Sequence, residues 1–512
     1  MRSELRLGTR KSLLAWAQSS WVAREVERLN PGITVKLVGI ETRGDKLLNV
    51  SLKNTEGKEF FVAELDEALR SGQVDFSVHS MKDLSLDRPT EFMLAAIPQR
   101  ANPRDIAIFC PDIIQRIKSG KQIQIGTSSP RRLENATAFL KQALPWPGNV
   151  QLSMAEIRGN VNTRLSRLHE TSERRLDGVI LAMAGLIRLA ADKQAEIELK
   201  NLLHNCRIMV LPLPECPAAP AQGALAVECL SKAENTIEAL HKLHHAATAT
   251  AVLKERGLLA ECGGGCHQRF GATAFEHQEL GALMFVRGMK PDDSFIEELR
   301  WKTHMAIKKK SNTAIRPWDG SAWRKNKGEF SVSEAALNAI SKNLPGKAVF
   351  VAHSRAFPPG FTETTDQCRI WTSGTASWFK LAGQGVWVEG CAENLGFNAL
   401  MSTISEPVLK LPSFKDWVVL THEDAVSEWS NTKAFATYNV KTDYPQEALT
   451  ALKQTTHIFW SSGSQFEALR DTAMKNAIHA CGPGKTASRL RSLGVEPLVF
   501  PSSEEWRKWL TS

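Results

Sequence analysis

Tyrosine is nearly absent from this chain, which has two tyrosines among 512 residues. The net charge is +9, yet the basic residues are dispersed, and the longest lysine run is the three residues at 308–310. Nucleic-acid-binding proteins gather their basic residues into patches and stack bases on aromatic rings. We therefore expect no nucleic acid partner. Nucleic acid binding stays open as an alternative, and a steep salt dependence would reveal it.

Long apolar runs are absent as well. The first 20 residues are charged from the outset, and no stretch is apolar enough for a membrane span. The nine cysteines are an odd number scattered through a long chain, which is not the pattern of a disulfide framework. We expect a cytoplasmic protein without an export signal or a membrane partner.

The length and an apolar content of 43% predict three or four globular domains. In the first 230 residues, short apolar runs alternate with helical patterns, as in a doubly wound α/β sheet. The expected strands are 33–40, 76–78, 92–97, 106–109, 124–126 and 178–181, and the expected helices are 11–29, 61–71, 131–144 and 162–170. Ligands bind at the ends of strands in such sheets, where helix N-termini favour anions.

Proline-rich stretches at 98–103 and 211–220 predict two crossings between a pair of lobes. A smaller unit follows, with a helix to about residue 259 and a strand near 283–287. The polar stretch 308–328 is expected to be a linker. Beyond residue 346 the strings IWTSG (370–374) and FWSSG (459–463) echo each other, which favours two similar α/β lobes.

Arginines near predicted turns indicate a site for a small molecule with several carboxylates. The clearest example is GTSSPRR at 126–132, which offers two hydroxyls and two guanidiniums where a strand gives way to a helix. Guanidiniums bind carboxylates bidentately, and each charged hydrogen bond contributes about 1.5–3 kcal/mol. A solvated helix face is the alternative, and it is the preferred interpretation for Arg167, Arg174 and Arg175.

Lys82 and Asp83 follow an apolar run, and a carboxylate there can move a proton or stabilise a developing cation. A surface ion pair is the alternative. Cys266 ends the run GGGC, whose glycines can shape a loop that presents the thiol for covalent chemistry. With Cys262 and His267 it could instead bind zinc, although a second ligand pair is lacking, or it could be a buried structural thiol.

Taken together, these motifs resemble the porphobilinogen deaminase (hydroxymethylbilane synthase) family of tetrapyrrole and heme biosynthesis. The resemblance covers about residues 4–300 and rests on RLGTRKSLLAWAQ, VHSMKDL, IGTSSPRR, IRGNVNTRL, ILAMAGLIRL, AQGALAVE and GGGCHQ, in family order. It implies two hinged periplasmic-binding-protein-like lobes, at 1–105 with 206–230 and at 106–205. A small α+β cofactor-attachment domain at 231–307, a linker at 308–345 and a C-terminal two-lobed α/β domain at 346–512 would follow.

The resemblance also implies a transferase that joins four porphobilinogen units head to tail with loss of ammonia. Its primer would be a dipyrromethane cofactor attached to Cys266, with Asp83 and Lys82 as catalytic residues and no metal. The cofactor-binding residues would be Arg10, Ser12, Lys82, Asp83, Ser128, Ser129, Arg131 and Arg132. The substrate-binding residues would be Gln18, Arg158, Arg164 and Arg188. A monomer is expected.

This sequence departs from the family pattern at a few positions. Ala63 replaces a loop lysine, Ala221 replaces the first glycine of Gly-Gln-Gly, Pro130 replaces a leucine, and His-Gln-Arg follows the cysteine. The expected cysteine, aspartate and central arginines are all present. The departures therefore bear on loop motion and rate more than on the reaction.

Residues 346–512 resemble uroporphyrinogen-III synthase through THIFWSSGSQFEAL, HACGPGKTASRLRSLGVEP and FATYNVKTDYP. This resemblance implies a lyase that cyclises the linear product, with substrate contacts from Tyr438, Ser461, Ser462 and Thr486. Fusing consecutive enzymes would raise the local concentration of the intermediate. The alternatives are an inactive C-terminal scaffold, an inactive deaminase relative, and a two-lobe anion-binding protein without chemistry.

Overall fold

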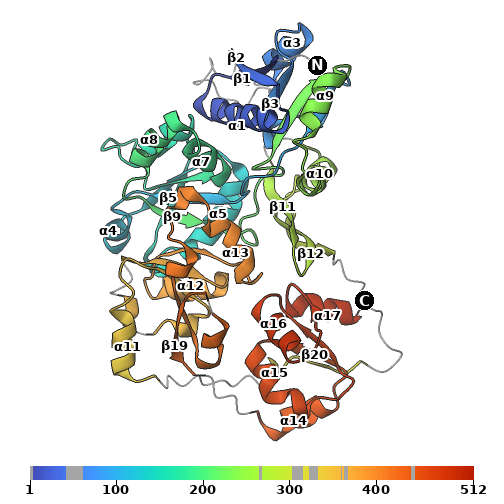
Figure 1. Ribbon diagram of the computed structural model, residues 1–512. Helices are drawn as coiled ribbons and strands as arrows, with labels where there is room; N and C mark the ends of the chain where they lie inside the picture. Colours follow the sequence, from blue (N-terminus) through green and yellow to red (C-terminus); the bar gives the residue numbers. More distant parts are fainter. Residues whose placement is uncertain are drawn as a thin grey trace. The chain divides into compact units, whose positions relative to one another are not determined.

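The computed structural model describes residues 4–41, 62–264, 268–302, 315–321, 332–358, 360–362, 367–429, 431–439 and 444–511. The chain forms two compact units (Figure 1). Unit 1 comprises residues 1–141, 149–275 and 284–300, and unit 2 comprises 142–148, 276–283 and 301–512. No helix in the described ranges has the length and apolar character that crossing a membrane requires.

Unit 1 contains two five-stranded sheets, and sheet A is built from the N-terminal residues. Its strand order is β2-β1-β3-β10-β4, and β10 runs antiparallel to both of its neighbours. The strands are β1 (Glu4–Arg10), β2 (Thr34–Ile40), β3 (Phe76–Ser80), β4 (Phe92–Ala96) and β10 (Leu225–Leu230). The associated helices are α1 (Leu13–Leu29), α3 (Ala63–Arg70) and α9 (Glu234–His241), with the 3-10 turn η3 (Met81–Asp83) after β3.

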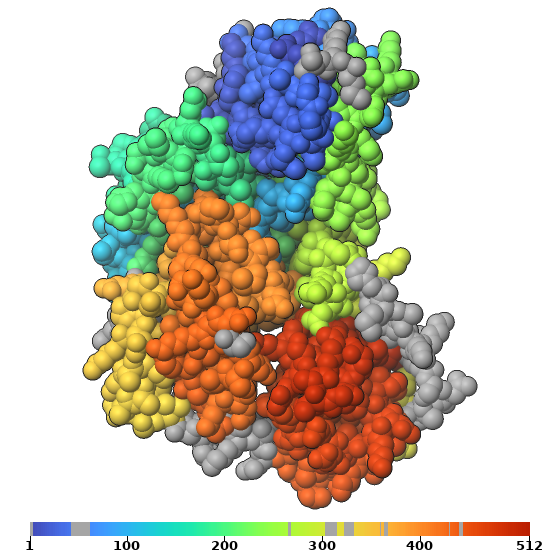
Figure 2. Space-filling view, in the orientation of Figure 1, coloured from blue at the N-terminus to red at the C-terminus, as the bar shows by residue number. Residues whose placement is uncertain are grey.

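The core of this lobe follows from the alternation of side chains along its strands. Leu7, Phe76 and Val227 are fully buried and pack with Val22 and Val26 of α1 in one apolar cluster. The space-filling view shows one outer face of this lobe, with its N-terminal residues in blue (Figure 2).

Sheet B has the order β7-β6-β8-β5-β9, and β5 is antiparallel to its neighbours. Its strands are β5 (Asp105–Phe109), β6 (Ile123–Gly126), β7 (Leu152–Ala155), β8 (Gly178–Ala182) and β9 (Arg207–Val210). The helices between them are α4 (Ile113–Lys118), α5 (Pro130–Ala143), η4 (Pro147–Asn149), α6 (Val161–Ser166), α7 (Met183–Ala190) and α8 (Lys193–Leu202). The strands of sheet B follow one another in the sequence, whereas sheet A takes its strand β10 from beyond them.

Two chain segments connect the sheets, one from β4 to β5 and one from β9 to β10. They are joined by a hydrogen bond from Ala101 N to Gly223 O, at 3.2 Å. Gly223 has φ +87°, and a Cβ there would lie 2.5 Å from the carbonyl oxygen of Ala101. Glycine is therefore required where the crossings touch. Ala221, the departure from the family's glycine, has φ +62°.

A three-stranded sheet, β11-β12-β13, follows α10 (Ala246–Glu261). Its strands are β11 (Arg269–His277), β12 (Gly281–Met289) and β13 (Phe295–Lys302). Leu258 and Leu259 of α10 pack with Phe270, Ala272 and other buried residues of the strands. Cys266, the expected attachment site, lies outside the described residues, as do Gly265 and His267.

Unit 2 contains two parallel sheets, C and D. Sheet C has the order β17-β16-β15-β18-β19, and sheet D has the order β14-β20-β21-β22. Sheet C and its helices comprise α11 (Glu334–Ser341), β15 (Ala348–Val351), η6 (Ser354–Ala356), β16 (Arg369–Thr372), α12 (Thr375–Gly383), β17 (Val388–Cys391), α13 (Phe397–Ile404), η8 (Pro407–Leu409), η9 (Phe414–Asp416), β18 (Val418–His422), η10 (Glu423–Glu428) and β19 (Lys433–Tyr438). Sheet D and its helices comprise β14 (Pro317–Trp318), α14 (Gln446–Lys453), β20 (His457–Trp460), α15 (Gly463–Leu469), η11 (Arg470–Thr472), β21 (Ile478–Cys481), α16 (Lys485–Ser492), β22 (Leu498–Val499) and α17 (Ser503–Thr511).

Tryptophan fills the cores of unit 2. Trp371 and Trp417 are buried at sheet C, with ring centroids 6.3 Å apart. At sheet D, Trp460 is fully buried and lies 5.8 Å from Trp318 between ring centroids. Both echoing strings are strands followed by a helix, β16 before α12 and β20 before α15.

The structure corrects the sequence-based expectations at two places. The helix expected at 162–170 ends at Ser166, because the chain turns there and the carbonyl of Arg167 accepts from Leu176 N at 3.0 Å. Within the expected linker 308–345, Pro317–Trp318 pair with β20 and α11 is helical. Trp318 is only 3% exposed, and a two-residue strand among polar neighbours gives no periodic pattern. Residues 303–314 and 322–331 lie outside the described residues.

Candidate active site

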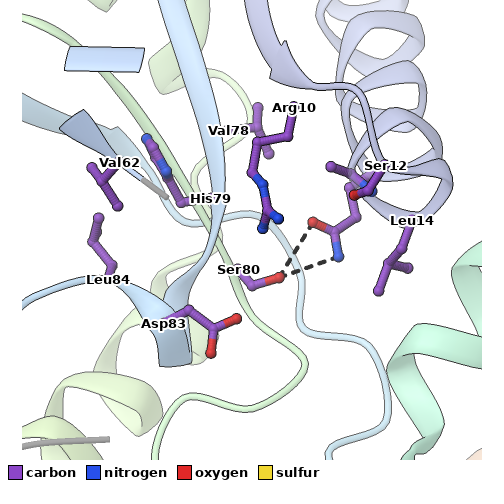
Figure 3. A pocket seen from close by; sticks show the side chains of 11 residues that line it. Arg10, Ser12, Leu14, Val62, Val78, His79, Ser80, Asp83 and Leu84 are labelled. Atoms are coloured by element: carbon purple, nitrogen blue, oxygen red, sulfur yellow. Dashed lines mark hydrogen bonds between the residues drawn. The ribbon is translucent and has the colours of Figure 1, made fainter. Parts of the chain in front are cut away.

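A cavity of about 120 Å³ opens at the ends of β1 and β3 in unit 1. Four predicted site residues line it, namely Arg10, Ser12, Gln18 and Asp83. Figure 3 shows the side chains of Arg10 and Asp83 directed toward the space beside Ser80. β1 and β3 are parallel neighbours, so the backbone leaves both strands at the same edge of the sheet. The short turns after these strands therefore place residues some 70 positions apart around one space.

Local structure fixes several of these side chains. Ser12 caps α1, and its hydroxyl accepts from Ala15 N at 3.4 Å. Gln18 is buried on the first turns of α1, with its Nε2 3.2 Å from Ser80 Oγ. Asp83 is exposed at the end of η3. The carboxylate is therefore accessible to a ligand in the cavity.

Ser80 and His79 also line the cavity, although they were not among the predicted site residues. His79 is buried, and its Nε2 lies 2.9 Å from Ser77 Oγ and 3.5 Å from a carboxylate oxygen of Glu228. Burial, with the nearby charges of Arg88 and Arg10, lowers the pKa of His79 to about 3. The imidazole is therefore neutral at physiological pH.

Arg131 and Arg132, at the start of α5, are buried beside Asp105 at the start of β5. Asp105 Oδ2 lies 2.8 Å from Arg131 Nη2, and Oδ1 lies 2.8 Å from Arg132 Nη2. Gln222 Nε2, from the second crossing, donates to Asp105 Oδ1 at 2.8 Å. Burial alone would raise the pKa of Asp105, but the two arginines outweigh it and hold the pKa well below its usual range.

Positive charge exceeds negative charge around this cluster. Burial lowers the pKa of Lys82, with Asp83 opposing the shift and Arg132 adding to it. Burial, followed by the charge of Arg132, lowers the pKa of Arg164 to about 10. Burying like charges together is costly unless anions compensate them. Because Asp105 supplies one carboxylate to several cations, the cluster fits an anionic ligand.

The other predicted residues lie at different positions in unit 1. Arg188 donates to the carbonyl of Gly223 at 2.5 Å, and burial lowers its pKa to about 10. Arg158 is exposed and lies 3.2 Å from Glu156. Ser128 and Ser129 precede α5, where Ser129 N donates to Thr127 Oγ1 at 3.3 Å. The predicted site residues of unit 1 therefore lie at several places: some line the cavity, Arg188 contacts the second crossing, and Arg158 is on the surface.

In unit 2, the predicted residues lie on two sheets. Ser461 and Ser462 follow β20, and Thr486 is the second residue of α16, which follows the neighbouring strand β21. Ser461 Oγ donates to Gln465 Oε1 at 2.8 Å, and Ser462 caps α15. Tyr438 ends β19 of sheet C and is only 5% exposed, and burial raises its pKa.

The zinc alternative requires a cluster of side chains that can bind a metal ion. Within the described ranges, no group of three or more His, Cys, Asp or Glu side chains could hold a metal ion. Cys262 is partly buried, and Cys266 and His267 lie outside those ranges.

Comparison with known proteins assigns the N-terminal part to a family. The family described as porphobilinogen deaminase, dipyromethane cofactor binding domain, matches residues 5–238. The porphobilinogen deaminase of Syntrophotalea carbinolica is 40% identical over 296 residues, covering 58% of this chain and 86% of that protein. The chain belongs to the porphobilinogen deaminase family. The deaminase of Trichlorobacter lovleyi is 42% identical over 51% of this chain and 76% of that protein.

The matched region is the family's dipyrromethane cofactor-binding domain, and it contains both five-stranded sheets of unit 1. The excess of cations around Asp105 fits a cofactor that carries carboxylates. Among solved structures, the methionine-binding protein MetQ aligns with a TM-score of 0.26 and 11% identity, over 52% of this chain and 99% of that chain. The family match does not extend to residues 346–512.

Proposed function

We propose that this deaminase-family chain joins four porphobilinogen units head to tail on a dipyrromethane attached to Cys266. Arg10, Ser12, Gln18 and Asp83 around one cavity carry the proposal. When bound, dipyrromethane supplies a nucleophilic carbon to which the pyrrole units are joined. The chain's own residues bind carboxylates, orient the reacting units and move protons.

In this proposal, Asp83 acts where ammonia leaves porphobilinogen. In its protonated form, the exposed carboxyl group at the cavity wall can pass its proton to the departing amine, and the carboxylate that results then faces the positive charge that develops on the pyrrole nitrogen. Lys82, the neighbouring residue, has a pKa that burial lowers and that the nearby charges of Arg132 and Arg131 lower further. It would bind a carboxylate together with them.

The arginines would bind acetate and propionate groups of the growing chain. Asp105 and Gln222 fix the guanidiniums of Arg131 and Arg132 before any ligand arrives, so little ordering remains at binding. Arg164 Nε is held by the carbonyl of Gly159 at 2.9 Å. Held in this way, the three side chains favour one orientation of a polycarboxylate, which is the requirement for repeated, local additions.

We further propose that residues 346–512 cyclise the linear product, as a uroporphyrinogen-III synthase would. Ser461, Ser462 and Thr486 lie at the carboxyl ends of neighbouring parallel strands, where α/β sheets bind ligands. Tyr438 would supply a phenolic hydroxyl from sheet C. The linear tetrapyrrole would then pass between activities within one chain.

Two substitutions in the full chain test these roles. Asp83→Asn should keep the cofactor mass and lower the rate of porphobilinogen consumption by about 100- to 10,000-fold. Asp87→Asn, at an exposed aspartate in the same loop, is the matched control and should keep the rate. Turnover by Asp83→Asn near that of the wild type would contradict the proposed catalytic role of Asp83.

For the C-terminal part, the product formed from porphobilinogen is identified. The wild type should yield the ring with its last pyrrole inverted, and Tyr438→Phe should accumulate the linear tetrapyrrole. Tyr444→Phe, at the second of the two tyrosines, is the control and should give the inverted ring. A wild-type protein that releases only the linear product would contradict the proposed synthase activity.

A further inference from the structure

Arg256, on α10, contacts the turn that carries Lys82 and Asp83. Its Nη1 donates to the carbonyls of Met81 at 3.0 Å and Leu84 at 3.1 Å, and its Nη2 donates to the carbonyl of Ser85 at 2.7 Å. These carbonyls lie on both sides of the Lys82–Asp83 pair. One guanidinium therefore holds the two ends of the turn together. It belongs to a residue more than 170 positions later in the sequence.

The turn itself is short. η3 is a single 3-10 turn of three residues, and the bond from Leu84 N to Met81 O that closes it is long, at 3.4 Å. Met81 N also donates to Ala224 O, at 3.0 Å. Hydrogen bonds from a charged donor are roughly twice as strong as neutral ones. The three bonds from Arg256 are therefore a major constraint on where Asp83 lies.

The residue before Arg256 ties the same helix to the crossings between the lobes. Glu255 is fully buried, and its Oε1 lies 2.6 Å from Arg100 Nη1 in the first crossing. It also accepts from Ala221 N in the second crossing and from Ala274 N in β11, both at 2.6 Å. Glu255 and Arg256 thus connect α10 to both crossings, to the small sheet and to the turn.

We infer that Arg256 is a positioning residue that fixes Asp83 relative to α10, the helix that ends at Glu261, five residues before Cys266 in the sequence. The inference rests on the proposed role of Asp83 in the reaction. Arg256 touches backbone oxygens on either side of Asp83 and acts through that residue. Its loss should displace the carboxylate and leave the arginines around Asp105 in place.

The test compares full-length Arg256→Leu and Arg256→Lys with the wild type. Amide hydrogen exchange is measured in peptides covering residues 80–86 and 123–126. In Arg256→Leu, exchange at 80–86 should rise at least about ten-fold, because local opening becomes easier, while exchange at 123–126 in sheet B stays unchanged. Arg256→Lys keeps a cationic donor and should show a smaller rise.

Steady-state kinetics supply a second readout. A displacement of about 1 Å at a reacting group lowers the rate by about 100-fold, so kcat of Arg256→Leu should fall to that extent with KM nearly unchanged. Its intact mass should still include the cofactor. Arg116→Leu, which removes a part-buried arginine paired with Asp177 at 2.5 Å in the other lobe, controls for general destabilisation and should keep kcat.

Unchanged exchange at 80–86 in Arg256→Leu would overturn the inference, whatever the kinetics show. A kcat of Arg256→Leu no lower than the kcat of Arg116→Leu would also overturn the inference. Asp83→Asn, assayed in parallel, separates the two ideas. If that variant turns over normally, the proposed role of Asp83 fails, while faster exchange in Arg256→Leu would still show that Arg256 holds the turn.

Discussion

Asp105→Asn tests the interpretation of the arginine cluster. Asp105 is fully buried and pairs with Arg131 and Arg132, each at 2.8 Å. Asparagine preserves the size of the side chain but leaves two buried guanidiniums without a counter-charge. Removing one partner of a buried ion pair costs about 3–5 kcal/mol, and we expect a loss of that size in the free energy of unfolding of unit 1.

The assay is amide hydrogen exchange of β5 and β8 as a function of urea concentration, which reports on unit 1 separately from unit 2. Asp112→Asn is the matched control, since Asp112 in the same lobe pairs with Arg175 but is 44% exposed. Exposed pairs contribute about 0–1 kcal/mol. A loss below about 1 kcal/mol in Asp105→Asn would refute the claim that this carboxylate compensates the buried arginines.

The stability difference between wild type and Asp105→Asn should also depend on pH. The pKa of Asp105 is depressed in the folded protein, so its contribution to stability is present above the unfolded pKa of about 3.9 and is lost as the pH falls through the folded value. The stability difference between wild type and Asp105→Asn should therefore be constant from pH 5 to pH 7 and shrink in acid below about pH 4. A difference that grows on acidification would contradict the assignment.

Two further predictions concern the crossing and the cavity. Gly223→Ala should lower the free energy of unfolding of unit 1 by about 1–3 kcal/mol, because its Cβ would meet the Ala101 carbonyl at positive φ. Gly257→Ala is the control in the same exchange assay and should be neutral or stabilising, since a Cβ at that helical position meets nothing within 4 Å. Equal losses of unfolding free energy in the two variants would contradict the role of the Ala101 contact. NMR of His79 should show a neutral imidazole from pH 5 to pH 8, because burial lowers its pKa to about 3; a titration midpoint in that range would refute this.

Much of the α/β framework could be predicted, because buried strands are short apolar runs. β3, β4, β5, β6 and β8 all lie where apolar runs predicted them. β1 was not among the predicted strands, although its sequence, ELRLGTR, begins with the alternation of charged and apolar residues that is typical of a half-buried strand. β14 has two residues and depends on pairing with β20, which no local pattern encodes.

The residues of the candidate site could be named from the sequence where they lie in short motifs. Arg10, Ser12, Gln18 and Asp83 lie in short motifs, and the structure brings them to one cavity. Asp105 and Arg256 were missed because their importance comes from partners far along the chain. A carboxylate that opens the apolar run DIAIF was the one available signal for Asp105. Arg256 on its helix resembles any partly exposed arginine until the helix packs beside residues 81–85.

The most direct test of the central claim is the intact mass of the purified full-length protein beside that of Cys266→Ser. The mass of the wild type should exceed its sequence mass by two linked porphobilinogen units, and Cys266→Ser should lack this excess. Cys262→Ser is the matched control and should keep it, because Cys262 is the neighbouring thiol in the same segment. A wild-type protein without the excess, after expression with ample porphobilinogen, would contradict the proposed covalent primer.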